Sequence, residues 1–282
     1  MRLALAALWI SVVPTCLFAQ KTEADLRARL VKKPLYLRGQ WSSDRLAFDG
    51  TGALKGTSAP VTFTLAGADI ESVKLTSKEL VLKAQRVGLE FDKDVPKRVG
   101  LVLRNVSGGT SPEEMTIRIQ MPADADFTAA LNAIFVDGIG ELVPQLPWYW
   151  QSFAQKHLLP AAAPAPKDNA RLPAASDSQE QPSAKSKLSR VGGSVSVPRP
   201  LTQVDPEFDS AARALRFSGI VLINLIVDAA GKPTQLQILR PAGLGLDERA
   251  LAAVSQYTFQ PAMENGSPVP VELNIEVNFQ RF

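Results

Sequence analysis

The C-terminal end of the chain alternates between apolar and polar residues. From Val269 to Phe279 every odd-numbered residue is apolar, and every even-numbered residue after Pro270 is polar. A period of two predicts a β-strand with one face in a core and the other in water. Because the sequence ends three residues after this segment, we expect the strand to lie at the edge of its sheet. An extended segment of another protein can pair at such an edge.

Two further strands and a tight turn precede this segment. Residues Ile220–Val227 are apolar on both faces, which favours a central position in a sheet. The sequence from Asp228 to Gly231 predicts a tight turn, with Gly231 where a positive φ is needed. Thr234–Leu239 is the expected partner strand. Residues 198–282 therefore contain a predicted three-stranded antiparallel sheet.

Two helices are predicted in the same module. Asp205 is the expected N-cap of the first helix, with Pro206 in the first turn, where its missing N–H costs nothing. Asp247 is the expected N-cap of the second helix. Leu246, before that cap, can pack on Leu251 as a hydrophobic staple. The strands and helices together predict a small α/β module.

Residues 20–159 are expected to form a mostly β domain of unknown function. Turn signals such as Asp49–Gly52 separate its alternating segments. Two stretches, Thr22–Val31 and Asp126–Phe135, have the apolar spacing of short helices. The predicted strands contain Val61, Phe63 and Leu65; Leu80 and Leu82; Val99, Leu101 and Leu103; and Met115, Ile117, Ile119 and Met121.

A linker is predicted between these two domains. Residues 160–200 contain seven prolines, many alanines and serines, and no aromatic residue. Such a composition cannot bury enough apolar surface to offset the entropy of ordering the chain. We therefore expect residues 160–197 to be a disordered linker.

The N-terminus has the features of an export signal. Arg2 is followed by the mostly apolar run Leu3–Val13, and Ala19 is a small residue at its end. This order predicts a secretory signal peptide over residues 1–19 and a periplasmic mature protein. The alternative is an uncleaved inner-membrane anchor through residues 3–19. Cys16 is the sole cysteine, so a processed chain has no disulfide, as the periplasm allows for a protein with a sizeable core.

Composition and single residues argue against several kinds of site. The formal net charge is +3, but the basic residues are scattered, so no nucleic-acid partner is expected. His157 is the sole histidine, which argues against a zinc site or a histidine-based triad. Asp92 and Asp94 lie in a charged loop, where solvated carboxylates are the ordinary interpretation. We therefore expect no enzymatic activity, no metal and no cofactor, although activity in residues 21–159 stays an alternative.

Two other motifs have both a functional and a structural interpretation. Gly243-Leu244-Gly245 precedes a helix like a dinucleotide-binding loop, but Glu248 stands at the third glycine position, so a turn into a helix cap explains it better. Pro147–Trp150 could form a binding platform for a carbohydrate or peptide, but burial of its aromatic rings is the favoured interpretation.

The order of elements in the C-terminal module resembles the TonB C-terminal domain. A helix, a strand, an Asp-Gly turn, a strand, a helix, an aromatic-x-aromatic-x-Pro motif and a terminal strand follow one another. The resemblance covers less than a third of the chain, and residues 37–52 are only weakly similar to regions ahead of TonB domains in other bacterial proteins. The motifs that carry it are Asp205–Phe208, Ala211–Ala214, Ser218–Val221, Val227–Pro233, Gly245–Ala250 and Phe259–Ala262.

The resemblance implies an α+β fold and a binding function. In that family the domain binds the TonB box, an extended segment of outer-membrane TonB-dependent receptors, by strand addition. Inner-membrane motor proteins are further partners that the resemblance implies. Two alternatives stay open: a homodimer whose second copy covers the terminal strand, and a scaffolding role without energy transduction. The residues expected to contact the receptor segment are Val271, Leu273, Asn274, Ile275, Glu276, Val277 and Phe279.

Overall fold

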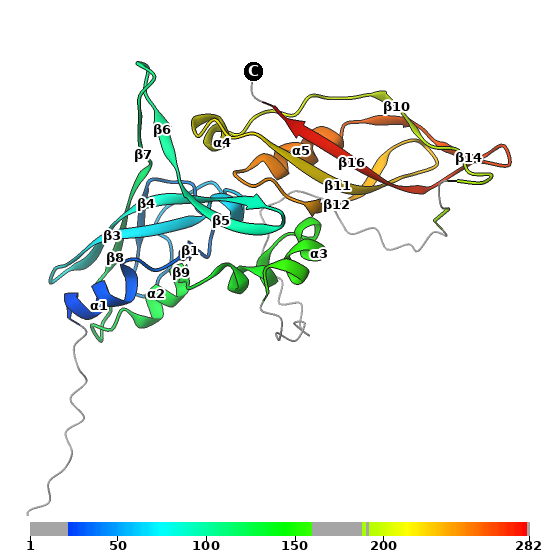
Figure 1. Ribbon diagram of the computed structural model, residues 1–282. Helices are drawn as coiled ribbons and strands as arrows, with labels where there is room; N and C mark the ends of the chain where they lie inside the picture. The colour runs from blue at the N-terminus through cyan, green and yellow to red at the C-terminus, as the bar shows by residue number, and fades with distance from the viewer. Residues whose placement is uncertain (1–21, 160–187, 190–191, 281–282) are drawn as a thin grey trace, which may run out of the picture.

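The computed structural model describes residues 22–159, 188–189 and 192–280. The predicted signal peptide and residues 160–187 of the predicted linker lie outside the described residues. Two folded parts lie side by side (Figure 1). We call them the N-terminal region, residues 22–159, and the C-terminal module, residues 192–280. Both combine helices with strands, so the predicted α+β class is confirmed.

The N-terminal region is built on one large sheet. Its elements are α1 (Glu23–Leu30), β1 (Leu35–Leu37), β2 (Arg45–Phe48), η1 (Phe63–Leu65), β3 (Gly67–Leu75), β4 (Glu79–Asp92), β5 (Val95–Gly100), β6 (Val102–Arg104), β7 (Thr110–Pro112), β8 (Glu114–Gln120), α2 (Thr128–Ile134), β9 (Phe135–Val136), η2 (Ile139–Gln145) and α3 (Trp148–His157). The strand order is β2-β8-β4-β3-β1-β9, and β5 pairs with β4 outside this path. All of these pairs are antiparallel except β2 with β8. The hairpin of β6 and β7 projects from the region (Figure 1).

Both helices predicted in this region are present. Thr22 caps α1 through a capping box, in which its hydroxyl accepts from Asp25 N–H and the Asp25 carboxylate accepts from Thr22 N–H. Leu26 and Leu30 are then buried on the face that meets the sheet. The second predicted helix is α2, which begins at Thr128. Apolar spacing alone was therefore enough to predict both elements.

The strand predicted around Val61, Phe63 and Leu65 is wrong, because Phe63–Leu65 is the 3-10 helix η1. The hydroxyl of Thr62 accepts from Thr64 N–H and starts this turn. Phe63, Thr64 and Leu65 are all buried, so the segment has no solvent face of the kind that an alternating strand implies.

Arg86 anchors a loop to the middle of β4. Its guanidinium is almost fully buried, donates to the carbonyl oxygens of Trp41, Ser42 and Ser43, and lies 3.1 Å from Glu113. A buried cation is tolerated when its donors are satisfied and a carboxylate is close. Burial lowers the pKa of Arg86 and raises that of Glu113, while their mutual attraction opposes both shifts.

The C-terminal module is built on a small antiparallel sheet. Its elements are β10 (Arg199–Thr202), α4 (Ser210–Ala214), β11 (Gly219–Val227), β12 (Pro233–Arg240), α5 (Leu246–Val254), β13 (Thr258–Gln260), β14 (Ala262–Glu264), β15 (Ser267–Val269) and β16 (Val271–Phe279). The main sheet has the order β12-β11-β16, so the central position predicted for the first strand is confirmed. The predicted turn is also present, with Gly231 at φ +78° and the Asp228 carboxylate accepting from two backbone N–H groups.

The predicted starts of both helices in this module are wrong. Asp209, not Asp205, caps α4, because its carboxylate accepts from Ala211 N–H at 3.0 Å. Asp247 lies inside α5, and Gly245 is the N-cap, with φ +77°. An aspartate before a helix predicts a cap only if its side chain turns back to the first turn. Asp247 instead accepts from the N–H groups of Ala242 and Gly243, in the loop before the helix.

The last residues of the predicted linker contact the C-terminal module. Ser189 N–H donates to Pro270 O, and Ser196 N–H donates to Met263 O. Val195 forms a backbone bridge with Glu264. These contacts place Ser189 beside the beginning of β16, and Val195 and Ser196 beside β14.

The N-terminal region and the C-terminal module share a backbone contact. Phe91 N–H donates to Ala242 O at 3.0 Å, and Leu244 N–H donates to Leu89 O at 2.8 Å. The loop 241–245 therefore pairs alongside the last residues of β4, with an antiparallel bridge between Glu90 and Gly243. Gly243 is required there, since its φ is +92° and an added Cβ would lie 2.1 Å from Leu89 O.

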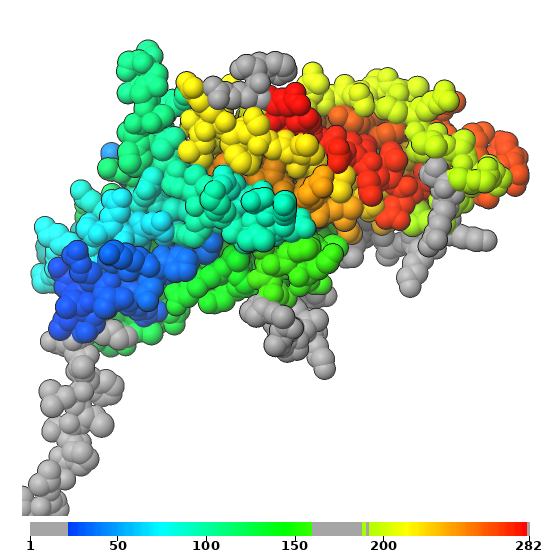
Figure 2. Space-filling view, in the orientation of Figure 1, coloured from blue at the N-terminus to red at the C-terminus, as the bar shows by residue number. Residues whose placement is uncertain are grey.

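Side chains from both parts meet at the N-terminus of α5. Glu248 Oε1 accepts from Thr62 Oγ1 at 2.7 Å and from Trp150 Nε1 at 2.8 Å. Glu248 Oε2 is buried and has no hydrogen-bond partner among the described residues. Trp150 is fully buried and packs edge-on against Phe63, so burial is confirmed for this residue, whereas Trp148 and Tyr149 are half-buried. The space-filling view shows the two parts packed against each other (Figure 2).

Candidate functional site

The edge of the C-terminal sheet is formed by β16. It pairs with β11 in an uninterrupted register, from Val271 opposite Val227 to Phe279 opposite Gly219. Within the described part of the chain, the sole backbone pairing on its other side is the bridge between Ser189 and Val271. β16 lies at the surface of the molecule (Figure 2). Residues 272–279 therefore form an open strand edge.

The opposite edge of the same sheet is occupied. Helix α3 of the N-terminal region packs beside β12 (Figure 1). Ile238 of β12 is fully buried in a cluster that includes Trp150 and Phe153 of this helix. The edge that a partner can reach is thus the one formed by β16.

Alternate residues of β16 direct their main-chain groups to the open edge. The Thr234 hydroxyl donates to Ile226 O at 3.1 Å, so the carbonyl of Ile226 points towards β12. The N–H and C=O groups of even-numbered residues in β11 therefore point towards β12, and those of odd-numbered residues point towards β16. On the outer side of β16, Pro270 O accepts from Ser189 N–H at 3.1 Å. Both observations leave the even-numbered residues of β16 with N–H and C=O groups facing outward. They are Glu272, Asn274, Glu276 and Asn278.

The side chains on the solvent face of β16 lean away from the open edge. Asn224 Nδ2 donates to Glu272 Oε1 and to Asn274 Oδ1, both at 2.8 Å. Glu276 pairs with Arg240 at 3.0 Å, across the width of β11. Charged side chains at an edge often block pairing with another chain. Here they are held over the sheet, which leaves the main-chain groups of the edge accessible.

The core-facing residues of β16 differ in burial. Val271, Val277 and Phe279 are buried, whereas Leu273 and Ile275 in the middle of the strand are half-buried. The predicted contact residues therefore have separate roles if a segment pairs here. The buried ones offer little side-chain surface, and the half-buried pair offers an apolar surface.

Three groups at this edge were not among the predicted contact residues. Glu272 belongs to the same alternation as the predicted contact residues. Asn224 was detectable as a polar residue inside an otherwise apolar strand. Arg240 had no local signal, because its ion pair with Glu276 depends on the strand register.

Other candidate sites are explained by packing. No group of three His, Cys, Asp or Glu side chains suited to a metal ion occurs in the described residues. His157 stacks on Phe153 at the end of α3. The Gly243–Gly245 loop forms the contact with β4 and the cap of α5 described above.

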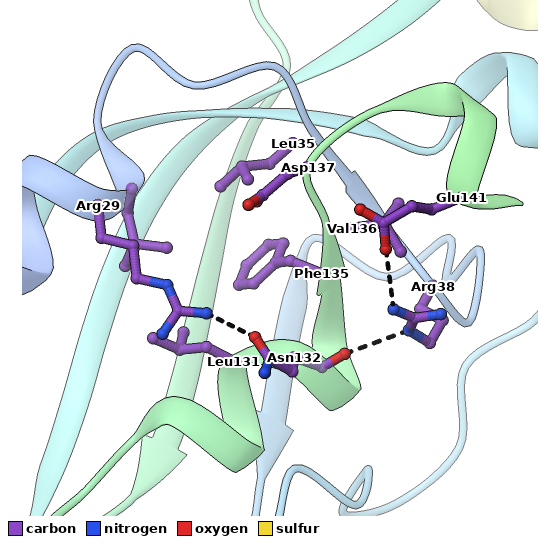
Figure 3. A pocket seen from close by; sticks show the side chains of 10 residues that line it. Arg29, Leu35, Arg38, Leu131, Asn132, Phe135, Val136, Asp137 and Glu141 are labelled. Carbon is purple, nitrogen blue, oxygen red and sulfur yellow. Dashed lines mark hydrogen bonds and ion pairs between the residues drawn. The ribbon is translucent and has the colours of Figure 1, made fainter. Parts of the chain in front are cut away.

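A polar cavity of about 270 Å³ lies in the N-terminal region (Figure 3). Asn132 accepts from Arg29 through its side chain, at 2.5 Å, and from Arg38 through its carbonyl, at 3.2 Å. Arg38 also lies 3.6 Å from Glu141. The two arginines are balanced by Asp137 and Glu141 in the cavity wall, so its charge does not select a ligand.

The C-terminal module matches a known protein family. The family described as Gram-negative bacterial TonB protein C-terminal matches residues 204–280. These residues form a TonB C-terminal domain. The match ends at β16, so the open edge belongs to this domain.

Two known proteins are similar to the TonB C-terminal domain of this chain. Protein TonB of Vibrio cholerae serotype O1 is 33% identical over 79 residues, which are 28% of this chain and 32% of that protein. The chain thus matches about a third of the length of this relative. A solution NMR structure of the Pseudomonas aeruginosa TonB C-terminal domain has 19% identity and a TM-score of 0.27, and the match covers 34% of this chain and 96% of that one.

No helix within the described residues has the length and apolar character that crossing a membrane requires. The segment predicted as a signal peptide or anchor is outside those residues.

Proposed function

We propose that this protein acts in the periplasm by binding an extended segment of an outer-membrane TonB-dependent receptor. The segment adds a fourth strand to the sheet beside β16. The observation that carries the proposal is the row of outward main-chain groups at Glu272, Asn274, Glu276 and Asn278. Strand addition uses such groups for affinity and alternate side-chain positions for specificity. The TonB C-terminal domain supports the choice of partner.

The arrangement of the rest of the molecule supports this choice of edge. Helix α3 packs beside β12, and the contact of Ser189 with Pro270 limits the available edge to the residues that follow. A bound segment of about seven residues can pair with residues 272–278, since each strand residue advances about 3.3 Å in both chains.

The experiment compares proline and alanine at one position. Asn274→Pro removes an N–H that faces the open edge, and a proline whose N–H would face solvent is tolerated in an edge strand. Asn274→Ala removes the same side chain but keeps the N–H. Fluorescence anisotropy with labelled synthetic TonB-box peptides measures binding to the full chain. We expect the proline variant to lose binding at least tenfold more than the alanine variant.

Circular dichroism and the urea midpoint show whether each variant keeps its fold. Equal peptide binding by a folded Asn274→Pro variant and by the unmodified protein would overturn the proposal. The alternative function is self-assembly through the same edge. Concentration-dependent dimerisation of the full chain, abolished by Asn274→Pro without any peptide binding, would assign the edge to a second copy.

A further inference from the structure

We infer that the segment recognised by β16 has the order basic, apolar, polar, apolar, basic, set opposite residues 272–276. This inference rests on the proposed function, because it names the class of peptide that the same edge accepts. The two faces of β16 carry different chemistry, and an added strand extends both faces. Residues directly opposite each other in neighbouring strands share a face and contact each other.

The core-facing side of β16 favours two apolar residues in the bound segment. Leu273 and Ile275 are half-buried, while Val271 and Val277 on either side of them are buried. The core is thus incomplete at the middle of the edge. Apolar side chains opposite Leu273 and Ile275 would remove the remaining surface of these two residues from water, which favours binding in proportion to the area covered.

The solvent-facing side of β16 favours positively charged residues in the bound segment. Glu272 accepts a hydrogen bond from the neutral amide of Asn224, and no ion pair of Glu272 occurs within the described residues. Glu276 has a cation, Arg240, but this arginine lies two strands away and is itself 46% exposed. A lysine or arginine opposite Glu272 or Glu276 would lie in the adjacent strand, at about 5 Å between Cβ atoms.

The pattern does not depend on strand direction. Glu272 and Glu276 flank Leu273, Asn274 and Ile275 symmetrically. A segment with a basic residue at each end of the five therefore fits β16 in both the parallel and the antiparallel orientation.

The same charges argue against a second copy as the occupant. Antiparallel pairing of two β16 strands centred on Asn274 places Glu272 opposite Glu276 of the other copy. Like charges directly opposite each other destabilise a strand pair. A basic and apolar segment of another protein is therefore the occupant that the edge favours.

Two labelled peptides test the inference against the full chain. One contains Lys-Val-Thr-Val-Lys and the other Glu-Val-Thr-Val-Glu, with identical Gly-Ser ends. At low salt we expect the basic peptide to bind about three- to tenfold more tightly, and the difference to shrink at about 0.5 M salt. Glu272→Lys should reduce or reverse this preference. Glu71→Lys, at an exposed position of β3, is the control and should leave it unchanged.

The outcomes separate this inference from the proposed function. Equal affinities for the two peptides, both abolished by Asn274→Pro, would keep strand addition at this edge and overturn the charge preference. A preference that Glu71→Lys changes as much as Glu272→Lys would show a general charge effect and also overturn it. Absence of binding by both peptides and by TonB-box peptides would overturn the inference together with the proposed function.

Discussion

Trp150 Nε1 donates a hydrogen bond to Glu248 Oε1 at 2.8 Å, across the contact between the N-terminal region and the TonB C-terminal domain. The same oxygen accepts from Thr62. The carboxylate is therefore held by two donors from the N-terminal region. Glu248 belongs to α5, and α5 packs against β11, the central strand of the sheet that contains β16. The carboxylate therefore connects the N-terminal region to this sheet through α5.

Removal of the indole donor should weaken this contact. Trp150→Phe keeps an aromatic ring but leaves Glu248 with one donor fewer, at a buried site. We expect the free energy of unfolding to fall by about 1–3 kcal/mol, measured by urea denaturation, because a buried acceptor loses a partner. Trp148→Phe at the half-buried start of α3 is the control, with an expected change of about 0.5 kcal/mol or less. Equal losses in the two variants would show that the hydrogen bond to Glu248 contributes nothing.

Stability should fall as the pH rises from about 5 to 8. Burial, with the neighbouring Glu248 as a second cause, raises the pKa of Asp247 to about 8, although N–H groups of Ala242 and Gly243 lower it. Between the unfolded and folded pKa values the native state binds more protons, so this group stabilises the fold at low pH and loses that effect as the pH rises through 8. The expected slope is up to about 1.4 kcal/mol per pH unit for one group.

Urea midpoints at several pH values measure this slope. Asp247→Asn should reduce it to the part contributed by Glu248, whose pKa burial also raises, whereas Asp228→Asn in the turn before β12 should leave it in place. An unchanged slope in Asp247→Asn would assign the pH dependence to groups other than Asp247.

Gly243→Ala should disrupt the contact between the N-terminal region and the TonB C-terminal domain. The new Cβ would lie 2.1 Å from Leu89 O, and the φ of +92° disfavours any side chain. We expect a loss of about 3 kcal/mol or more in unfolding free energy. Gly266→Ala has φ +81° but open space around the Cβ, so it should cost only about 1 kcal/mol. Similar losses in both variants would mean that the close approach to Leu89 does not matter.

Arg86→Met should be among the most destabilising single changes in the N-terminal region. It leaves the carbonyls of Trp41, Ser42 and Ser43 without their donor, and it leaves Glu113 without its cation. The expected loss is about 3–5 kcal/mol by chemical denaturation.

Arg118→Met is the matched control for Arg86→Met. Arg118 is 54% exposed and pairs with Glu79 at the surface, so its loss should cost about 1 kcal/mol or less. A smaller effect at Arg86 than at Arg118 would contradict the role of the buried cation.

Local patterns predicted most elements of the TonB C-terminal domain. The strands β11, β12 and β16 and the turn at Gly231 follow from alternation and turn chemistry within a few neighbouring residues. Helix starts were less predictable, because Asp205 and Asp209 carry the same capping group. The hydrogen bond from Ala211 N–H to Asp209 decided between them.

The sequence by itself determined the alternation of β16, the central position of β11 and the family of residues 204–280. Each of these features depends on residues close together in the chain or on the order in which short motifs follow one another. The tertiary structure alone decided which edge of the β12-β11-β16 sheet is open and which side chains donate to Glu248. Both depend on residues far apart in the chain, since Trp150 and Thr62 are 98 and 186 positions from Glu248. No pattern within a short window contains such a contact, and only the packing of α3 and η1 against the domain creates it.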